Sequence, residues 1–486
     1  MAATGFEDRV AGDNGAVDHR AADPAEVAGL GWLGIVRLGL IQTALGAIVV
    51  LTTSTLNRVM VVELGLLAML PGLLVGLHYG IQMLRPRWGY GSDVGGHRTP
   101  WIIGGMAVLA VGGALAAAAT ALMSVAFYSG LLLSVVAFTL IGVGVGACGT
   151  NLLTLLATSV APSRRAAAAS TVWIMMIAGF VVTAITAGHF LDPFTMARLV
   201  VVASVVSALA FVVTIGAIWG IEEAHRKRLA LASARTPQPA PPQTDAGSAQ
   251  KQAFMDTLRE VWAETHARRF TIFVFVSMLA YSMQDLILEP FAGIIFGMTP
   301  GQSTALAGTQ NGGVLVGMIF VAIVGSLSGG SKVKTLRAWC VGGCLASAVS
   351  LVGLSIAAHV GPGWPIQASV FALGASNGAF AVAAIGSMMG LASHGREKRE
   401  GTRMGLWGAA QAIAFGLGGL FGAVLVDISR QVLGTPVTAY STVFAIEALL
   451  FVLSGFLALQ VGRTAQDDER AEINLGGEAL MEMDGR

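Results

Sequence analysis

Residues 88–100 read WGYGSDVGGHRTP, a short polar loop between two long apolar runs. Gly89 and Gly96 permit a tight turn, because glycine adopts backbone angles that other residues avoid. We expect the Asp93 carboxylate to accept hydrogen bonds from the start of a neighbouring helix and Arg98 to pair across its half of the molecule. An ordinary polar loop is the alternative, since loops of Gly, Asp and Arg are common. The role of such a loop is mechanical, so it indicates a fold rather than a substrate.

Composition places the chain in a membrane. Of its 486 residues, 55% are hydrophobic and 12% are charged, and the mean hydropathy is +0.72. Soluble domains are about a quarter charged. The 63 glycines suggest closely packed helices. A net charge of +1 gives no sign of nucleic-acid binding, and three cysteines make no disulfide framework.

Apolar runs of about twenty residues, each long enough to cross a bilayer, recur along the chain. They fall at about 35–56, 66–84, 101–121, 127–157, 170–190, 198–220, 270–290, 303–328, 336–358, 366–392, 404–427 and 440–461. The predicted fold is therefore an all-α membrane protein with twelve transmembrane helices in two six-helix halves.

The expected domain organisation follows from the polar segments. It consists of a disordered cytoplasmic tail (1–30), an N-terminal six-helix half (31–220), a cytoplasmic linker (221–268), a C-terminal six-helix half (269–462) and a second disordered cytoplasmic tail (463–486). The linker is rich in Pro, Ala and Gln. Its end, AFMDTLREVWAETHARR, has apolar residues at helical spacing, which fits an amphipathic surface helix or a plain linker helix.

Basic residues predict the orientation. With the N-terminus in the cytoplasm and twelve spans, only Arg58, Arg198 and Arg430 of the 29 basic residues fall on the far side. This asymmetry follows the positive-inside rule. We therefore expect a multi-pass membrane protein with both termini cytoplasmic.

The two halves repeat each other. Segments 165–173 and 399–407 each begin with Arg and end with Trp, and Asp192 and Asp427 end the two spans that follow. Matched features in two six-span halves are typical of the parallel repeats of major facilitator transporters.

Polar and charged residues also occur at matching places in spans 1 and 7. Asn57, Arg58 and Glu63 lie where span 1 ends, and Asp285 and Glu289 lie four residues apart on one helical face near the end of span 7. One hypothesis is that Arg58 pairs with one of these two acids and clamps the halves together. The other is that the acids form a proton or cation site, since intramembrane acids are functional candidates.

Four collinear stretches give the chain a specific resemblance. They are TLNRVMVVELG (55–65), RPRWGYGSDVGGHRTPW (85–101), QDLILEPFAGIIFGM (284–298) and GLWGAAQAIAFGLGG (405–419). Together they resemble the PucC/LhaA family, which includes relatives labelled as a bacteriochlorophyll synthase chain. The loop at 88–100 fits the major facilitator pattern, except that Val94 replaces the usual basic residue. The resemblance implies a major-facilitator-like protein of phototrophic bacteria, located in the intracytoplasmic photosynthetic membrane.

The same resemblance implies a pigment cargo, bacteriochlorophyll or a late precursor bound transiently. His78 lies well inside span 2 and is the candidate axial ligand of the pigment magnesium. Gln82 lies one turn further on the same face. Asn151 and Gln411 are further candidate pigment contacts. The alternative for all four is ordinary hydrogen bonding within the bundle.

Three functions remain open. The family favours a non-enzymatic factor that delivers bacteriochlorophyll or assembles light-harvesting polypeptides. A membrane partner or scaffold of late bacteriochlorophyll biosynthesis enzymes is the first alternative. A proton-coupled small-molecule transporter is the second, and it needs ionisable residues near the midplane. In the sequence Glu447 is the best such acid and stands alone. No catalytic motif supports an enzyme.

Overall fold

The computed structural model describes residues 29–85, 87–88, 92, 97–161, 164–233, 259, 262–327, 332–392 and 400–484. Over this part of the chain the regular structure is helical, without strands. Predictions for residues 1–28, and for all of the linker from 234 to 261 except residue 259, lie outside the described residues.

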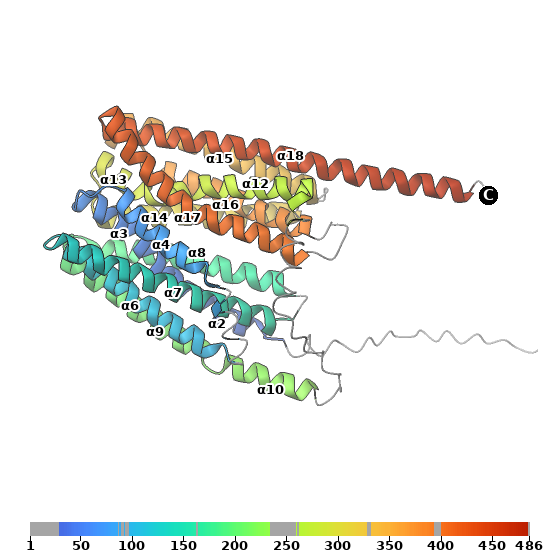
Figure 1. Ribbon diagram of the computed structural model, residues 1–486, viewed down its shortest axis with the longest axis horizontal. Coiled ribbons are helices and arrows are strands. Elements are labelled where there is room, and N and C mark those ends of the chain that lie inside the picture. The colour runs from blue at the N-terminus through green and yellow to red at the C-terminus, as the bar shows by residue number, and fades with distance from the viewer. Residues whose placement is uncertain are drawn as a thin grey trace, which may run out of the picture.

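The N-terminal half comprises helices that run side by side in one bundle (Figure 1). They are α2 (Trp32–Val50), the π-helical η1 (Leu51–Thr55), α3 (Leu56–Arg58), the π-helical η2 (Val59–Glu63), α4 (Met69–Gln82), α6 (Thr99–Met123), α7 (Phe127–Ser159), α8 (Arg165–Leu191) and α9 (Met196–Ile218). Helix α10 (Ile221–Ser233) follows at the linker side.

The C-terminal half is a second bundle packed on the first. It comprises α12 (Thr265–Met283), the 3-10 turn η4 (Gln284–Leu286), α13 (Leu288–Phe296), α14 (Pro300–Leu327), α15 (Lys332–Val360), η5 (Gly361–Gly363), α16 (Ile366–Ala392), α17 (Glu400–Leu433) and α18 (Pro436–Asp484). Each half has its own apolar core. Leu286 belongs to the C-terminal half but packs into the core of the N-terminal half.

Small residues bring the helices together within a half. A Cβ at Gly144 would lie 2.5 Å from the backbone nitrogen of Leu109, and one at Gly105 would lie 2.6 Å from that of Cys148. Helices α6 and α7 can therefore approach until their backbones almost touch, which is how membrane helices associate without a hydrophobic driving force.

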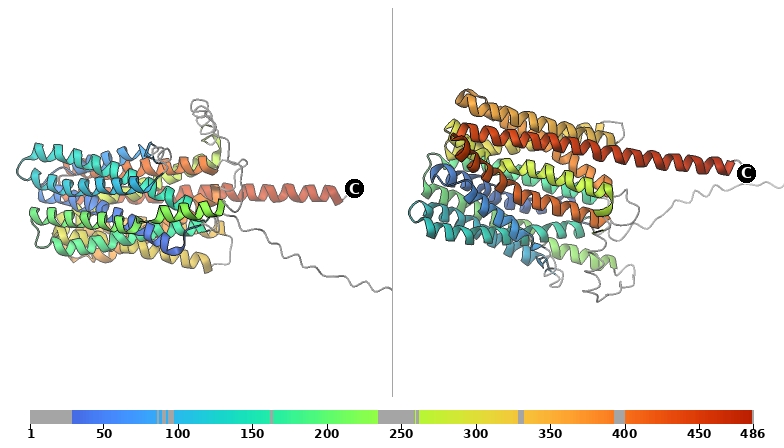
Figure 2. Two further views of the ribbon diagram at one scale, coloured as in Figure 1. Left: turned by 90° about the horizontal axis from the view of Figure 1, so that it is seen from below. Right: turned by 45° about the horizontal axis from the view of Figure 1, so that its top comes forward.

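The two halves meet along two helix pairs, α8 with α14 and α4 with α17. Figure 2 shows from two further sides that the blue-to-green first half and the yellow-to-red second half pack against each other. The pairs are equivalent under the sequence repeat. In the first pair, a Cβ on Gly301 would lie 2.3 Å from the carbonyl oxygen of Gly188. In the second, a Cβ on Gly72 would lie 3.1 Å from Cβ of Ala423.

The predicted fold is confirmed. Among the described residues, ten helices are long and apolar enough to cross a membrane, and α12 with α13 forms a further span bent by 41°. The remaining predicted span, 66–84, corresponds to α4, whose regular part has 14 residues.

The linker and the C-terminal tail differ from the expectation. Helix α10 occupies the start of the predicted linker, and α12 begins at Thr265, inside its predicted end. Residues 463–486 were expected to be a disordered tail. In the structure, α18 continues past the bundle to Asp484 (Figure 1). Its residues beyond the membrane are rich in Ala, Glu, Leu and Met, which favour helix, and no proline interrupts them.

Candidate functional site

Span 7 is broken where it contacts the N-terminal half, and Pro290 explains the break. We call this contact between the two halves the seam. Proline has no N–H to donate to the carbonyl four residues earlier, and its ring clashes with that carbonyl. Here that carbonyl belongs to Leu286. The chain passes through the turn η4 and restarts as α13 at Leu288, with a bend of 41°.

The carbonyl freed by Pro290 is satisfied from the other half. Asn57 Nδ2 on α3 donates a hydrogen bond of 2.6 Å to the oxygen of Leu286, and both residues are buried. Close by, the hydroxyls of Thr55 and Thr304 lie 2.9 Å apart across the same seam. Spans 1 and 7, which are equivalent in the repeat, are therefore joined at the point where each departs from α-helical geometry.

Arg58 is the central cation of the seam and is only 2% exposed. Its Nη1 forms an ion pair with Glu63, five residues on, because the π-helical winding of η2 stacks residues five apart. Its Nη2 donates a 2.6 Å hydrogen bond to the carbonyl of Met298 in the other half. Gly293 makes room for the guanidinium, since a Cβ there would lie 3.0 Å from Nη2.

In the structure Arg58 does contact the other half, but its ion pair is not the one that the clamp hypothesis predicted. Arg58 reaches the C-terminal half through a backbone carbonyl, and its ion pair is made with Glu63 of its own span rather than with Asp285 or Glu289. Glu289 is nevertheless close enough to be attracted by Arg58.

Glu289 faces a ring of hydroxyls. Its carboxylate is buried and surrounded by Ser54, Ser303 and Thr304, although none is aligned well enough to form a hydrogen bond with it. The seam therefore contains a buried acid that lies among hydroxyl groups from both halves.

Two aspartates make further hydrogen bonds between the halves. Asp427 on α17 accepts hydrogen bonds from the backbone N–H groups of Ala68 (3.1 Å) and Met69 (2.7 Å), so it caps the start of α4. Its repeat equivalent, Asp192, accepts a 2.8 Å hydrogen bond from the hydroxyl of Thr299, just before α14. The sequence placed both residues at span ends but gave no sign that each reaches a helix start in the opposite half.

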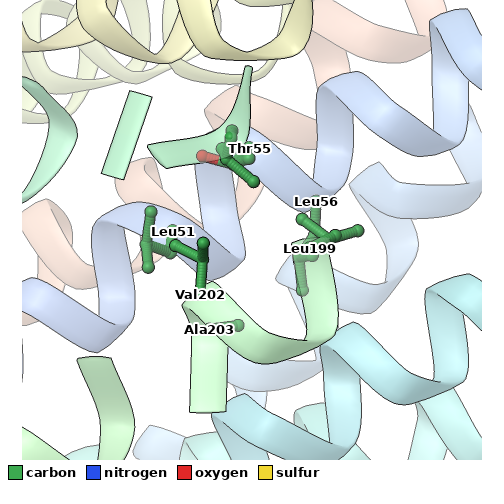
Figure 3. A pocket seen from close by; sticks show the side chains of 7 residues that line it. Leu51, Thr55, Leu56, Leu199, Val202 and Ala203 are labelled. Carbon is green, nitrogen blue, oxygen red and sulfur yellow. The ribbon is translucent and has the colours of Figure 1, made fainter. Parts of the chain in front are cut away.

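The structure also contains a small cavity beside η1 and a larger groove elsewhere in the N-terminal half. The cavity, of about 10 Å³, adjoins η1 and has room for about one water molecule (Figure 3). It is lined by Leu51, Thr55, Leu56, Leu191, Leu199, Val202 and Ala203. The groove, of about 320 Å³, runs between α6 and α7. It is lined by Trp88, Pro100, Trp101, Gly104, Gly105, Val108, Val143 and Ala147.

The candidate axial ligand, His78, is closed off in this conformation. Arg85 donates to Oε1 of Gln82, which orients the amide so that its Nε2 donates to Nε2 of His78 at 3.0 Å. The imidazole lone pair at Nε2 is thus occupied, and Nδ1 is buried without a partner. His78 is 1% exposed and lines neither the cavity nor the groove, so the residues as placed do not fit a magnesium macrocycle.

The other predicted residues make contacts inside their half. Asn151 Nδ2 donates to the Ala147 carbonyl of its own helix at 2.8 Å, and Gln411 Nε2 lies 3.9 Å from Sδ of Met278 on α12. Neither contact tests a role in pigment binding.

The loop that opened the sequence analysis is described only in part. Gly89, Asp93 and Gly96 lie outside the described residues. Arg98 Nη1 donates to the hydroxyl of Thr158 at 3.1 Å. The start of α6 is capped by Glu222 of α10, whose carboxylate accepts 2.8 Å hydrogen bonds from the backbone N–H groups of residues 98 and 99. The sequence gave no signal for this cap, since Glu222 stands among other charged residues after span 6.

Comparisons with known proteins agree with this architecture. The PUCC protein family model matches residues 55–466. The chain is 52% identical to the "Bacteriochlorophyll synthase 44.5 kDa chain" of Rhodobacter capsulatus, over 89% of this chain and 96% of that protein. It is 29% identical to "Protein PucC" of Cereibacter sphaeroides, over 89% and 92% of the two chains.

Solved structures share the fold at low sequence identity. A bacterial homologue of the lysosomal transporter Spinster, inward-facing and unoccupied, aligns with a TM-score of 0.59 and 16% identity over 92% of this chain and 99% of its own. A proton-dependent oligopeptide transporter aligns with a TM-score of 0.63 and 13% identity over 89% and 98%. These likenesses establish a major-facilitator-like fold. With its full-length relatives and the family match, the chain belongs to the PucC protein family.

Proposed function

We propose that this chain is a non-enzymatic membrane factor that handles bacteriochlorophyll, or a late precursor, for light-harvesting or photosynthetic complexes. The observation that carries the proposal is its 52% identity, along nearly the whole length, to a protein named for bacteriochlorophyll. Light-harvesting polypeptides or late biosynthesis enzymes are its partners, and the intracytoplasmic photosynthetic membrane is its location, with both termini in the cytoplasm.

The name of that relative contains the word synthase, but three features favour handling over synthesis. Relatives that carry the name PucC match over a similar length, and the fold is one that solved transporters use to move cargo. In addition, the residues gathered at the seam are caps and clamps that hold two halves together.

The groove between α6 and α7 is the described cavity best suited to a pigment. Its volume of about 320 Å³ lies at the lower end of the range for small-molecule sites, so it suits part of a pigment, such as the hydrocarbon tail. Trp88 and Trp101 supply flat apolar surface, while Gly104 leaves space. The groove is therefore the proposed contact, in place of the enclosed His78.

An absorption spectrum of the chain purified in mild detergent from its phototrophic host tests the proposal. We expect a stoichiometric bacteriochlorophyll or late-precursor band. Gly104→Leu fills the groove without an internal clash, because no atom lies within 4 Å of its Cβ position, and it should abolish most of the band. Gly342→Leu is the matched control, an exposed and uncrowded helical glycine of the other half.

His78→Ala separates the two candidate sites. Because Gln82 occupies Nε2 and the ring is buried, we expect the band to persist in this variant. Loss of the band in His78→Ala with retention in Gly104→Leu would move the site to α4. A wild-type chain that carries no pigment but retains late biosynthesis enzymes would refute pigment handling and favour the scaffold function.

A further inference from the structure

Helix α13 carries a buried acid in its first turn. Glu289 is 2% exposed, and neither of its carboxylate oxygens has a hydrogen-bond partner among the described residues. Oδ1 of Asn57, in the other half, is likewise buried without a partner. All three atoms are hydrogen-bond acceptors. The seam therefore presents several oxygen lone pairs that no described donor fills.

The packing of spans 1 and 7 shows which part of the other half Glu289 faces. The two spans run in the same direction, and α3 and α13 lie at the same end of the bundle (Figure 1). A Cβ on Gly293 would lie 3.0 Å from Nη2 of Arg58 and 3.2 Å from Cγ2 of Val62. Gly293 thus faces residues 58–62. Glu289 lies one helical turn earlier on the same face, so it faces residues 54–58.

Hydroxyl groups from both halves meet at this level. Ser54 and Thr55 end the π-helical η1, and the Thr55 hydroxyl lies 2.9 Å from that of Thr304 on α14. This contact brings the first turns of α14, including Ser303, to the same place. The carboxylate of Glu289 accordingly lies among the hydroxyls of Ser54, Ser303 and Thr304.

The charges gathered here do not balance. Arg58 forms its ion pair with Glu63, and its Nη2 donates to the carbonyl of Met298. The charges of Arg58 and Glu63 therefore cancel, and the carboxylate of Glu289 remains. A buried carboxylate without a counter-charge is very costly, so a cation or a proton has to accompany it.

The donor atoms indicate which class of cation fits. Carboxylate and hydroxyl oxygens are ligands for hard cations, whereas transition metals favour nitrogen and sulfur. Glu289 supplies a single negative charge, which matches a monovalent ion. The backbone also suits an ion site, because π-helical turns are frequent at functional sites and broken membrane helices hold ions in several transporter folds.

We propose that Glu289 and the hydroxyls of Ser54, Ser303 and Thr304 bind a small monovalent cation, such as sodium, between the two halves. Because the ligands come from both halves, the bound cation fastens the seam. This inference goes beyond the handling of pigment and does not depend on it.

Binding of radioactive sodium to the purified full chain in detergent micelles tests the site. The buffer is mildly alkaline, and choline replaces sodium at constant ionic strength. We expect saturable binding of one ion per chain, which Glu289→Gln abolishes because it removes the charge and keeps the size. Glu447→Gln is the matched control and should bind as the wild type does. Glu447 is also a buried acid without a partner, but Phe444, three residues earlier, packs on Phe291.

Two milder variants keep the proposal testable if Glu289→Gln does not fold. Ser54→Ala and Thr304→Val each remove one oxygen ligand, and we expect the affinity for sodium to fall several-fold in each. Unchanged affinity in both would overturn the site. So would a wild type without saturable sodium binding, which would mean that Glu289 holds a proton or is neutralised by Arg58. Equal loss of binding in Glu447→Gln would also overturn it.

Discussion

Replacing Asp427 by alanine should weaken the seam far more than the same change at its repeat equivalent, Asp192. Asp427 is buried and accepts two backbone hydrogen bonds at the start of α4. Asp192 accepts one hydrogen bond, from the hydroxyl of Thr299, in a more exposed setting.

The magnitudes follow from these contacts. A hydrogen bond to a charged group contributes about 1.5–3 kcal/mol, so losing the two bonds of Asp427 should lower the free energy of unfolding by about 3 kcal/mol or more. Favourable interaction with the dipole of α4 adds to this loss. Losing the single exposed contact of Asp192 should cost about 1 kcal/mol. The predicted difference between the two variants is therefore about 2 kcal/mol.

The assay is reversible unfolding of the purified chain in mixed micelles, followed by circular dichroism. Asp427→Asn is the intermediate control, because its remaining carbonyl oxygen can still accept one of the two backbone hydrogen bonds, and we expect about half of the loss. Equal destabilisation by Asp192→Ala and Asp427→Ala would refute the claim that Asp427 caps α4.

Three further predictions concern the seam and the linker side. Asn57→Leu should lower the free energy of unfolding by about 1–3 kcal/mol in the same assay, since the buried carbonyl of Leu286 loses its donor; wild-type stability would contradict this. Gly293→Ala should cost about 1–3 kcal/mol, because its Cβ would lie 3.0 Å from the guanidinium of Arg58; a neutral effect would mean that Arg58 moves freely. Glu222→Gln should speed amide hydrogen exchange in the first turn of α6 severalfold, since the carboxylate that accepts from two of its N–H groups loses its charge; unchanged exchange would refute the cap.

The spans and the repeat could be predicted from sequence because their signals are local. Apolar runs mark the helices, and Pro290 marks the break in span 7 whatever surrounds it. The partner of the freed carbonyl could not be predicted, since Asn57 lies more than two hundred residues earlier in the chain. Likewise, Asp427 was visible as the end of a span, but its contact with the start of α4 depends on how the halves pack.

Local helix winding explains the wrong partner of Arg58. In a regular α-helix, residues five apart do not share a face, so the sequence gives no sign of a pair between Arg58 and Glu63. The π-helical η2 brings Glu63 to Arg58 instead.

The most direct test of pigment handling is to delete this chain in the phototrophic host and to quantify pigments and complexes together. The account predicts that assembled light-harvesting complexes fall while no late bacteriochlorophyll precursor accumulates at the expense of its product, and that the wild-type chain restores the complexes. Accumulation of such a precursor with loss of its product, reversed by the wild-type chain, would contradict the account and identify an enzyme.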